Sequence, residues 1–148
     1  MTNEKKLSAK NAGDAAEFYV AYMLSRLGIS AALTTSGTSA VDIVATIDGS
    51  KSISIQVKGS WARSQPRQWM IGTHKPSVSP DLFYIFCNMP GEFKERISPE
   101  IFIVPSADVF ETATWHHKAP LFKITPATED SYKNNWDALL TALIHLGQ

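Results

Sequence analysis

The chain has 148 residues, of which 44% are apolar, and its 14 Lys and Arg residues balance its 14 Asp and Glu residues. This composition predicts one ordinary domain over residues 1–148, large enough to form a core without disulfides or a structural metal. The single cysteine, Cys87, excludes an internal disulfide and a thiolate zinc site. Because the N-terminal residues lack the apolar core of a secretory signal and no apolar run is long enough for a membrane span, we expect a cytoplasmic protein.

The first periodic pattern along the chain is helical. Apolar residues from Ala16 onward recur on one stripe, which predicts a helix that starts near Asn11 and stops at Gly28. Three aromatic residues of this helix lie off the main stripe: Phe18, Tyr19 and Tyr22. We therefore expect the helix to have a second neighbour, either the C-terminal helix or another subunit.

After this helix the pattern changes to alternation, which is typical of strands. Strands are predicted over residues 29–35, 41–47, 52–57, 68–73, 82–87 and 101–104, and helices over residues 106–113 and around Trp136. The turn sequence Asp48-Gly49-Ser50 joins two of these strands into a hairpin. The order predicts an α/β fold: a mixed β-sheet flanked by helices, with helix, β-hairpin or meander, helix, strand and C-terminal helix in sequence.

The predicted hairpin carries a polar cluster. Alternate residues of a strand share a face, so Asp42, Gln56 and Lys58 lie on the side opposite the apolar residues. A turn at residues 48–50 sets Asp42 opposite Gln56, with the Val57 carbonyl close by. Oxygen ligands of this kind suit Mg²⁺, and an ammonium group beside such an ion suits phosphodiester hydrolysis.

The segment VDIVATIDGSKSISIQVKGS, residues 41–60, resembles the core of the PD-(D/E)XK nuclease superfamily, the fold of type II restriction enzymes and archaeal Holliday-junction resolvases. Asp42 matches the motif's Asp, and Gln56-Val57-Lys58 matches its (D/E)XK segment. The resemblance implies a restriction-endonuclease-like core, Mg²⁺ or Mn²⁺ bound by Asp42, Gln56 and the Val57 carbonyl, Lys58 as catalytic lysine, and Glu17 on the first helix as a supporting acid. Two features depart from the pattern: Gln56 replaces an acid, which lowers the negative charge of the site, and no Pro precedes Asp42.

The charges are unevenly distributed along the chain. From Gly49 to Pro80 there is no Asp or Glu but five Lys and Arg residues, so this stretch carries +5, whereas the other residues, nine basic and 14 acidic, carry −5. Basic residues interleaved with tryptophan are typical of nucleic-acid-binding surfaces, where indoles stack on bases. The candidate nucleic-acid contacts are Lys51, Trp61, Arg63, Arg67, His74 and Lys75. A core position remains an alternative for Trp61, and it is the expected one for Trp69.

Together these patterns predict a metal-dependent endonuclease that hydrolyses phosphodiester bonds in DNA. Because one domain supplies one active site, cutting both strands of a duplex needs a dimer, and the first helix and the helix around Trp136 are the candidate contact surfaces. Two alternatives remain open. The same fold could bind nucleic acid without cutting it, with Gln56 marking a lost metal site. Alternatively, Asp42 and Lys58 could form only a cross-strand pair in a protein-interaction domain.

Overall fold

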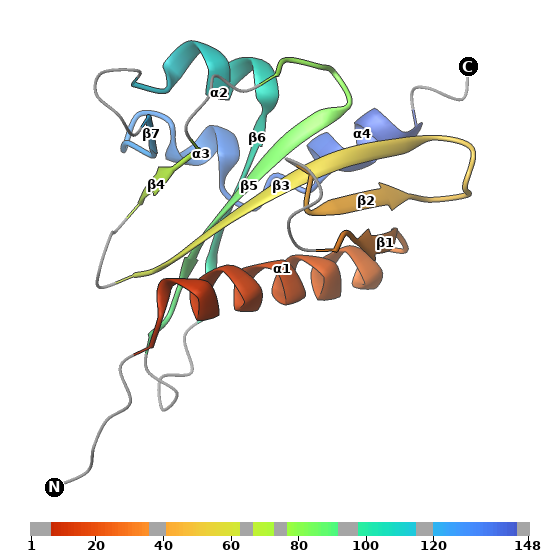
Figure 1. Ribbon diagram of the computed structural model, residues 1–148. Coiled ribbons are helices and arrows are strands. Elements are labelled where there is room, and N and C mark those ends of the chain that lie inside the picture. Colours follow the sequence, from red (N-terminus) through yellow and green to blue (C-terminus); the bar gives the residue numbers. More distant parts are fainter. Residues whose placement is uncertain are drawn as a thin grey trace, which may run out of the picture.

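A mixed five-stranded sheet with strand order β1-β2-β3-β5-β6 forms the centre of the molecule (Figure 1). The computed structural model describes residues 7–35, 41–62, 67–72, 77–91, 98–114 and 120–144. The sheet strands are β1 (Ser30–Leu33), β2 (Ile43–Thr46), β3 (Ser52–Trp61), β5 (Leu82–Met89) and β6 (Glu100–Pro105). A second, two-stranded sheet pairs β4 (Gln68–Met70) with β7 (Leu121–Lys123). The helices are α1 (Ala9–Arg26), α2 (Ser106–Thr112), α3 (Glu129–Tyr132) and α4 (Asp137–Ile144). This architecture confirms the predicted fold class.

Helix α1 begins two residues before the predicted start. Its N-cap is Ser8, whose hydroxyl oxygen accepts a hydrogen bond from the backbone N–H of Asn11 at 3.1 Å. Asn11 therefore lies inside the first turn and does not cap the helix. The C-terminal end is as predicted, because Gly28 has a φ of +80°, the left-handed conformation that follows many helices.

The β2–β3 hairpin has the predicted register. Ile43 lies opposite Ile55, and the ladder ends at Thr46 and Ser52, so the connecting loop is longer than the three residues expected. Strand β3 also continues four residues beyond its predicted end, to Trp61. The extension forms because β3 pairs in parallel with β5 from Ser54 to Trp61, an interaction between segments that are distant in sequence.

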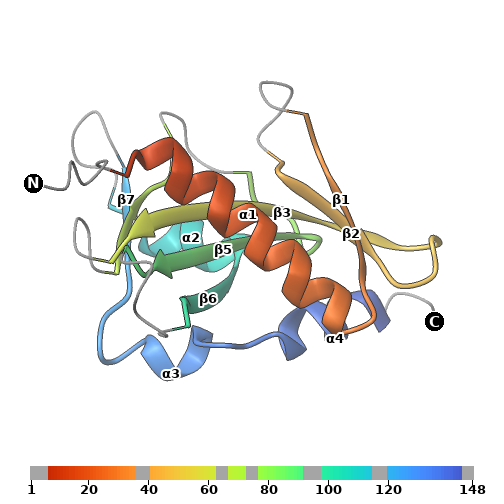
Figure 2. The same ribbon diagram turned by 90° about the horizontal axis from the view of Figure 1, so that it is seen from below.

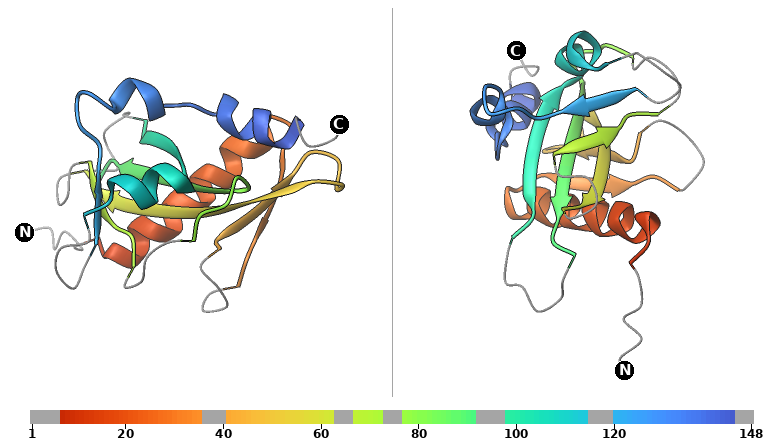
Figure 3. Two further views of the ribbon diagram at one scale, coloured as in Figure 1. Left: turned by 90° about the horizontal axis from the view of Figure 1, so that it is seen from above. Right: turned by 90° about the vertical axis from the view of Figure 1, so that its left-hand side faces the viewer.

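Two apolar layers cover the opposite faces of the main sheet. One face packs against α1 and α4, which contribute Ala16, Val20, Leu24, Leu139 and Leu143 to a buried cluster. Figure 2 shows α1 lying across this face, with α4 beside its C-terminal end. The other face packs against α2 and the two-stranded sheet (Figure 3). The described parts of the chain contain no helix that is long and apolar enough to cross a membrane.

Helix α4 is turned toward the core. Trp136, Leu139 and Leu143 are buried in the cluster beneath α1. They are therefore not available for the subunit contact that the sequence suggested for this helix. The outer side of α1 stays exposed, with Phe18 and Tyr22 on it, and α4 keeps Ile144 exposed.

Candidate active site

The site lies where β2 separates from β3. The β2–β3 ladder ends at Ile43 and Ile55, and Asp42 and Gln56 are the next residues of the two strands beyond this pair. The Asp42 N–H donates to the Ile55 carbonyl at 2.9 Å, and the Asp42 carbonyl accepts from the Thr34 N–H at 2.9 Å. These backbone bonds fix Asp42 to both neighbouring strands, just beyond the last residue pair of the β2–β3 ladder.

The Asp42 carboxylate takes the place of a missing strand partner. Its Oδ2 accepts a hydrogen bond from the backbone N–H of Val57 at 2.8 Å. The N–H and C=O of a strand residue point to the same strand edge, so the Val57 carbonyl also faces the gap left by β2. The carboxylate and this carbonyl therefore border one opening at the edge of β3.

Glu17 reaches the same opening from α1. Its carboxyl lies close enough to the Asp42 carboxyl for the two groups to interact, although the two residues are distant in sequence. Burial raises the pKa of Glu17, and the nearby charge of Asp42 raises it further. Two carboxyl groups held together in this way favour a shared proton or a bound cation.

Close packing of α1 on β3 makes this contact possible. A Cβ atom at Gly59 would lie 2.5 Å from the Ala16 Cβ and 2.6 Å from the Ala12 carbonyl oxygen. Glycine is therefore required where the helix crosses the strand, one residue from Glu17 on the helix. Our sequence reasoning missed Gly59. The sequence signal that could have indicated this close contact was a pair of alanines spaced i, i+4 on the helix together with a glycine in the strand.

The donor set of the site suits a hard cation. The further oxygen donors that the sequence predicts for this site are the amide of Gln56, which is 8% exposed, and the Val57 carbonyl. Among the described residues, no third His, Cys, Asp or Glu joins the Glu17–Asp42 pair. Oxygen donors of this kind fit Mg²⁺ or Mn²⁺, with one negative charge fewer than an acid at position 56 would supply.

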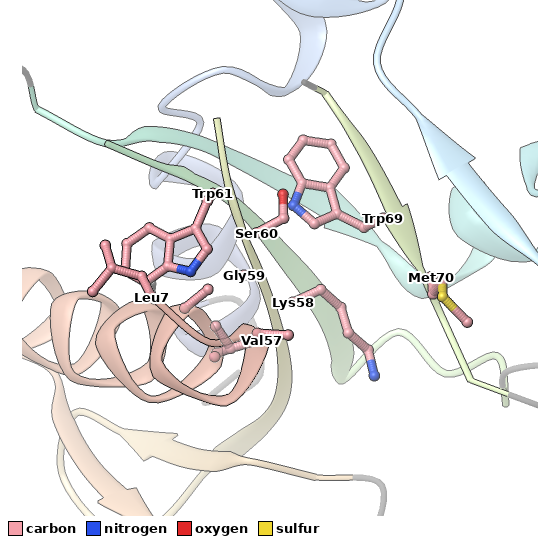
Figure 4. Close-up of a pocket in the computed structure, with 11 residues that line it drawn as sticks. Leu7, Val57, Lys58, Gly59, Ser60, Trp61, Trp69 and Met70 are labelled. Atoms are coloured by element: carbon pink, nitrogen blue, oxygen red, sulfur yellow. The ribbon is translucent and has the colours of Figure 1, made fainter. Parts of the chain in front are cut away.

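Lys58 is the next residue on the Gln56 side of β3. Its side chain extends from the strand into the space beside Met70 of β4, whereas Val57 lies on the α1 side (Figure 4). It borders a pocket of about 540 Å³, which is also lined by Gly59, Trp61 and Met70. Lys58 thus lines this pocket, whereas neither Glu17 nor Asp42 is among the residues that line it.

Two of the predicted nucleic-acid contacts are engaged in ion pairs within the protein. The Arg67 guanidinium donates to both carboxylate oxygens of Glu129, at 2.9 and 2.8 Å, and to Glu100 at 3.0 Å. The Lys51 ammonium lies 3.2 Å from the Asp81 carboxylate. The prediction treated both cations as free because their partners lie outside the stretch without acids. Folding brings these carboxylates onto the basic stretch and neutralises it at two points.

The two tryptophans of the basic stretch have different environments. Trp69 is 2% exposed, and its indole N–H donates to the Cys87 carbonyl at 3.0 Å, which confirms its predicted core position. Trp61 is half-buried, and its indole N–H donates to the Ser8 carbonyl at 2.9 Å at the start of α1. The remaining candidates lie outside the described residues: Arg63, His74 and Lys75.

The arrangement of the whole chain is similar to a known nuclease structure. The fold matches that of a bacterial homing endonuclease, I-Ssp6803I, with a TM-score of 0.64 and 17% sequence identity. The match covers 96% of this chain and 98% of the endonuclease chain. Comparison of the sequence with known families and with curated proteins gives no match. The likeness therefore rests on structure, and it shows that the two chains share a fold.

Proposed function

We propose that the protein is a metal-dependent nuclease of the PD-(D/E)XK type that hydrolyses phosphodiester bonds in DNA. The observation that carries the proposal is the pair of interacting carboxyl groups, Glu17 and Asp42, at the point where β2 leaves β3. Gln56 and Asp42 are the first residues beyond the β2–β3 ladder, and Lys58 follows Gln56 on the same side of β3. The shared fold with a homing endonuclease supports the same class of activity.

In this proposal the oxygen donors Asp42, Glu17, Gln56 and the Val57 carbonyl would bind Mg²⁺ or Mn²⁺. Such an ion, when bound, polarises a phosphate and makes a coordinated water more acidic. The Val57 N–H donates a hydrogen bond to Oδ2 of Asp42. This bond fixes the orientation of the carboxylate toward the opening. The Lys58 ammonium would donate to a phosphate oxygen and stabilise the negative charge that develops during attack.

The direct test is cleavage of plasmid, linear duplex, branched and single-stranded substrates with Mn²⁺. Wild type should cleave at least one class, and Lys58→Ala and Asp42→Asn should both lose this cleavage while keeping wild-type circular dichroism. Lys123→Ala removes an exposed lysine on β7 of the small sheet and is the matched control, with unchanged cleavage expected. Equal activity of wild type and Lys58→Ala would refute the proposed role of the lysine.

A second candidate function is nucleic-acid binding without cleavage. It is favoured by the small number of charged ligands, because the described residues gather only two carboxyl groups and an amide at the site. This alternative predicts that no substrate is cut by any variant, while nucleic acid still binds with a steep dependence on salt concentration. If the protein neither cleaves nucleic acid nor binds it in a salt-sensitive way, both candidate functions are contradicted.

A further inference from the structure

The outer side of α1 carries an unpartnered aromatic pair. Phe18 is 64% exposed and Tyr22 is 56% exposed, one helical turn apart. The opposite side of the helix is buried against the sheet, and the views show no described element packed against the outer side (Figures 1 and 3). Single exposed apolar residues are common, but two adjacent aromatic rings form a patch of the kind found at interfaces.

Charged residues of opposite sign lie at the two ends of this patch. Asp14 precedes Phe18 by one turn, and Arg26 follows Tyr22 by one turn. The Lys10 ammonium nitrogen lies 2.6 Å from Oδ2 of Asp14, and both side chains are exposed to solvent. The Arg26 guanidinium lies 5.8 Å from the centroid of the Tyr22 ring. The outer stripe of the helix therefore has the order acid, aromatic, aromatic, base.

This order is complementary to itself when the direction of the helix is reversed. In two antiparallel copies related by a two-fold axis, Asp14 of each helix would face Arg26 of the other. The same alignment sets Phe18 against Tyr22, so that aromatic rings meet at the centre and opposite charges meet at both ends. A parallel alignment would instead bring like charges together, which is unfavourable.

We propose that this surface, defined by Asp14, Phe18, Tyr22 and Arg26, binds a second copy of the same chain through an antiparallel α1–α1 contact about a two-fold axis. The charge order favours a second copy over an unrelated partner, because one surface supplies both complementary halves. The twelve residue steps from Asp14 to Arg26 make the stripe roughly 18 Å long. It buries less than the ~1,200–2,000 Å² of stable interfaces, so we expect a weak dimer with a Kd of roughly 1–100 µM.

The proposed contact would also connect two candidate active sites. Glu17 precedes Phe18 in the chain and points to the Asp42 carboxyl, whereas Phe18 is exposed on the outer side of the helix. Each helix of the pair would therefore face its own site on one side and its partner on the other. The dimer itself does not depend on the proposed nuclease activity, because none of its four residues belongs to the candidate site.

Sedimentation velocity from about 1 µM to 500 µM tests the proposal. Wild type should shift from monomer to dimer over this range. Asp14→Arg and Arg26→Asp should each weaken association at least tenfold, because each creates two like-charge contacts per dimer. The double variant restores opposite charges at both ends and should recover the wild-type Kd to within roughly threefold. Phe18→Ser, which removes a central ring, should abolish the dimer.

Glu111→Arg on α2 makes the same charge change on another exposed helix and should leave the Kd unchanged. Circular dichroism of every variant checks that α1 remains folded. A wild-type protein that stays monomeric at 500 µM would overturn the proposal. A dimer that persists in both single variants, or that fails to return in the double variant, would overturn the antiparallel contact.

Discussion

Oδ2 of Asp42 accepts a hydrogen bond from the backbone N–H of Val57 at 2.8 Å, across the end of the β2–β3 ladder. A carboxylate thus stands where a strand carbonyl would otherwise pair with β3. The bond holds the acid at the strand edge and satisfies a backbone donor with the same atom. Asp42→Ala would leave this donor unpaired as well as removing the charge. Asp42→Asn keeps an acceptor oxygen and is the better test of the charge alone.

Gln56→Glu should strengthen metal binding. The change adds a negative charge opposite Asp42, so we expect the Mn²⁺ Kd to fall by about tenfold or more, equivalent to ~1.4 kcal/mol. Without metal, a nearly buried third acid should lower the free energy of unfolding by about 1–3 kcal/mol. Titration calorimetry with Mn²⁺ and urea unfolding with and without Mn²⁺ measure both effects. Gln68→Glu on β4 is the control, and a Kd unchanged from wild type in Gln56→Glu would contradict the assigned ligand.

Gly59→Ala should destabilise the fold, whereas Gly13→Ala should not. A Cβ at Gly59 would lie 2.6 Å from the Ala12 carbonyl oxygen, so the backbone of α1 has to shift, at a cost of about 3 kcal/mol. Nothing lies within 4 Å of a Cβ built at Gly13, which is inside the same helix. Alanine there should add about 0.5–1 kcal/mol to the free energy of unfolding. Urea unfolding measures both, and a neutral Gly59→Ala would disprove the close helix–strand contact.

The ion-pair network around Arg67 predicts a loss of stability at acid pH. Burial alone raises the pKa of Glu100, but hydrogen bonds from Asn88, Arg67 and Lys133 outweigh it, and the pKa is lowered. The hydrogen bond from Arg67 likewise lowers the pKa of Glu129. A lowered pKa means that the folded state binds protons less readily than the unfolded chain. The stabilisation is therefore complete above the ordinary Glu pKa of 4.5 and is lost as the pH falls through the lowered value.

Glu100→Gln tests this pH dependence. The variant should have a lower free energy of unfolding than wild type at pH 7, and the difference should shrink steadily below about pH 4.5 as the wild-type carboxyl becomes protonated. Glu111→Gln, an exposed acid on α2, should show a small difference with no such trend. Urea unfolding at pH 7, 5, 4 and 3 provides the comparison. A difference that is constant with pH would exclude the ion pair as its source.

Cys87 should be unreactive in the folded protein. Its side chain is fully buried, and burial raises the pKa of the thiol, so little thiolate is available to react. We expect no reaction with a colorimetric thiol reagent at pH 8 under native conditions and reaction of one thiol per chain in 6 M guanidinium chloride. Rapid native labelling would show that the core opens readily around β5.

Local sequence patterns were sufficient for much of the fold. Period-two alternation fixed which residues of β2 and β3 share a face, so the register of Ile43 with Ile55 followed from the need to bury both apolar faces in one core. Gly28 marked the end of α1 because its left-handed conformation is unfavourable for other residues. The N-terminal boundary of α1 was placed too late, since Ser8 and Asn11 are both good N-cap residues.

Contacts between distant segments decided the rest. The charges of residues 49–80 suggested free cations, but the partners of Arg67 are Glu100 and Glu129, 33 and 62 residues away. Strand β3 extends beyond its alternating pattern because β5 pairs with it in parallel. Glu17 on α1 could be matched to a family position by resemblance. Its contact with Asp42, however, depends on how closely α1 packs against β3 at Gly59.

The sequence by itself determined the α/β class, the hairpin and the face of β3 that Gln56 and Lys58 share. These features depend on side-chain alternation and turn residues, which act between neighbours along the chain. Only the tertiary structure decided that Glu17 meets Asp42, that Arg67 is neutralised and that the outer side of α1 stays exposed. Those outcomes depend on packing distances and charge pairs between segments far apart in sequence, and no local pattern encodes them.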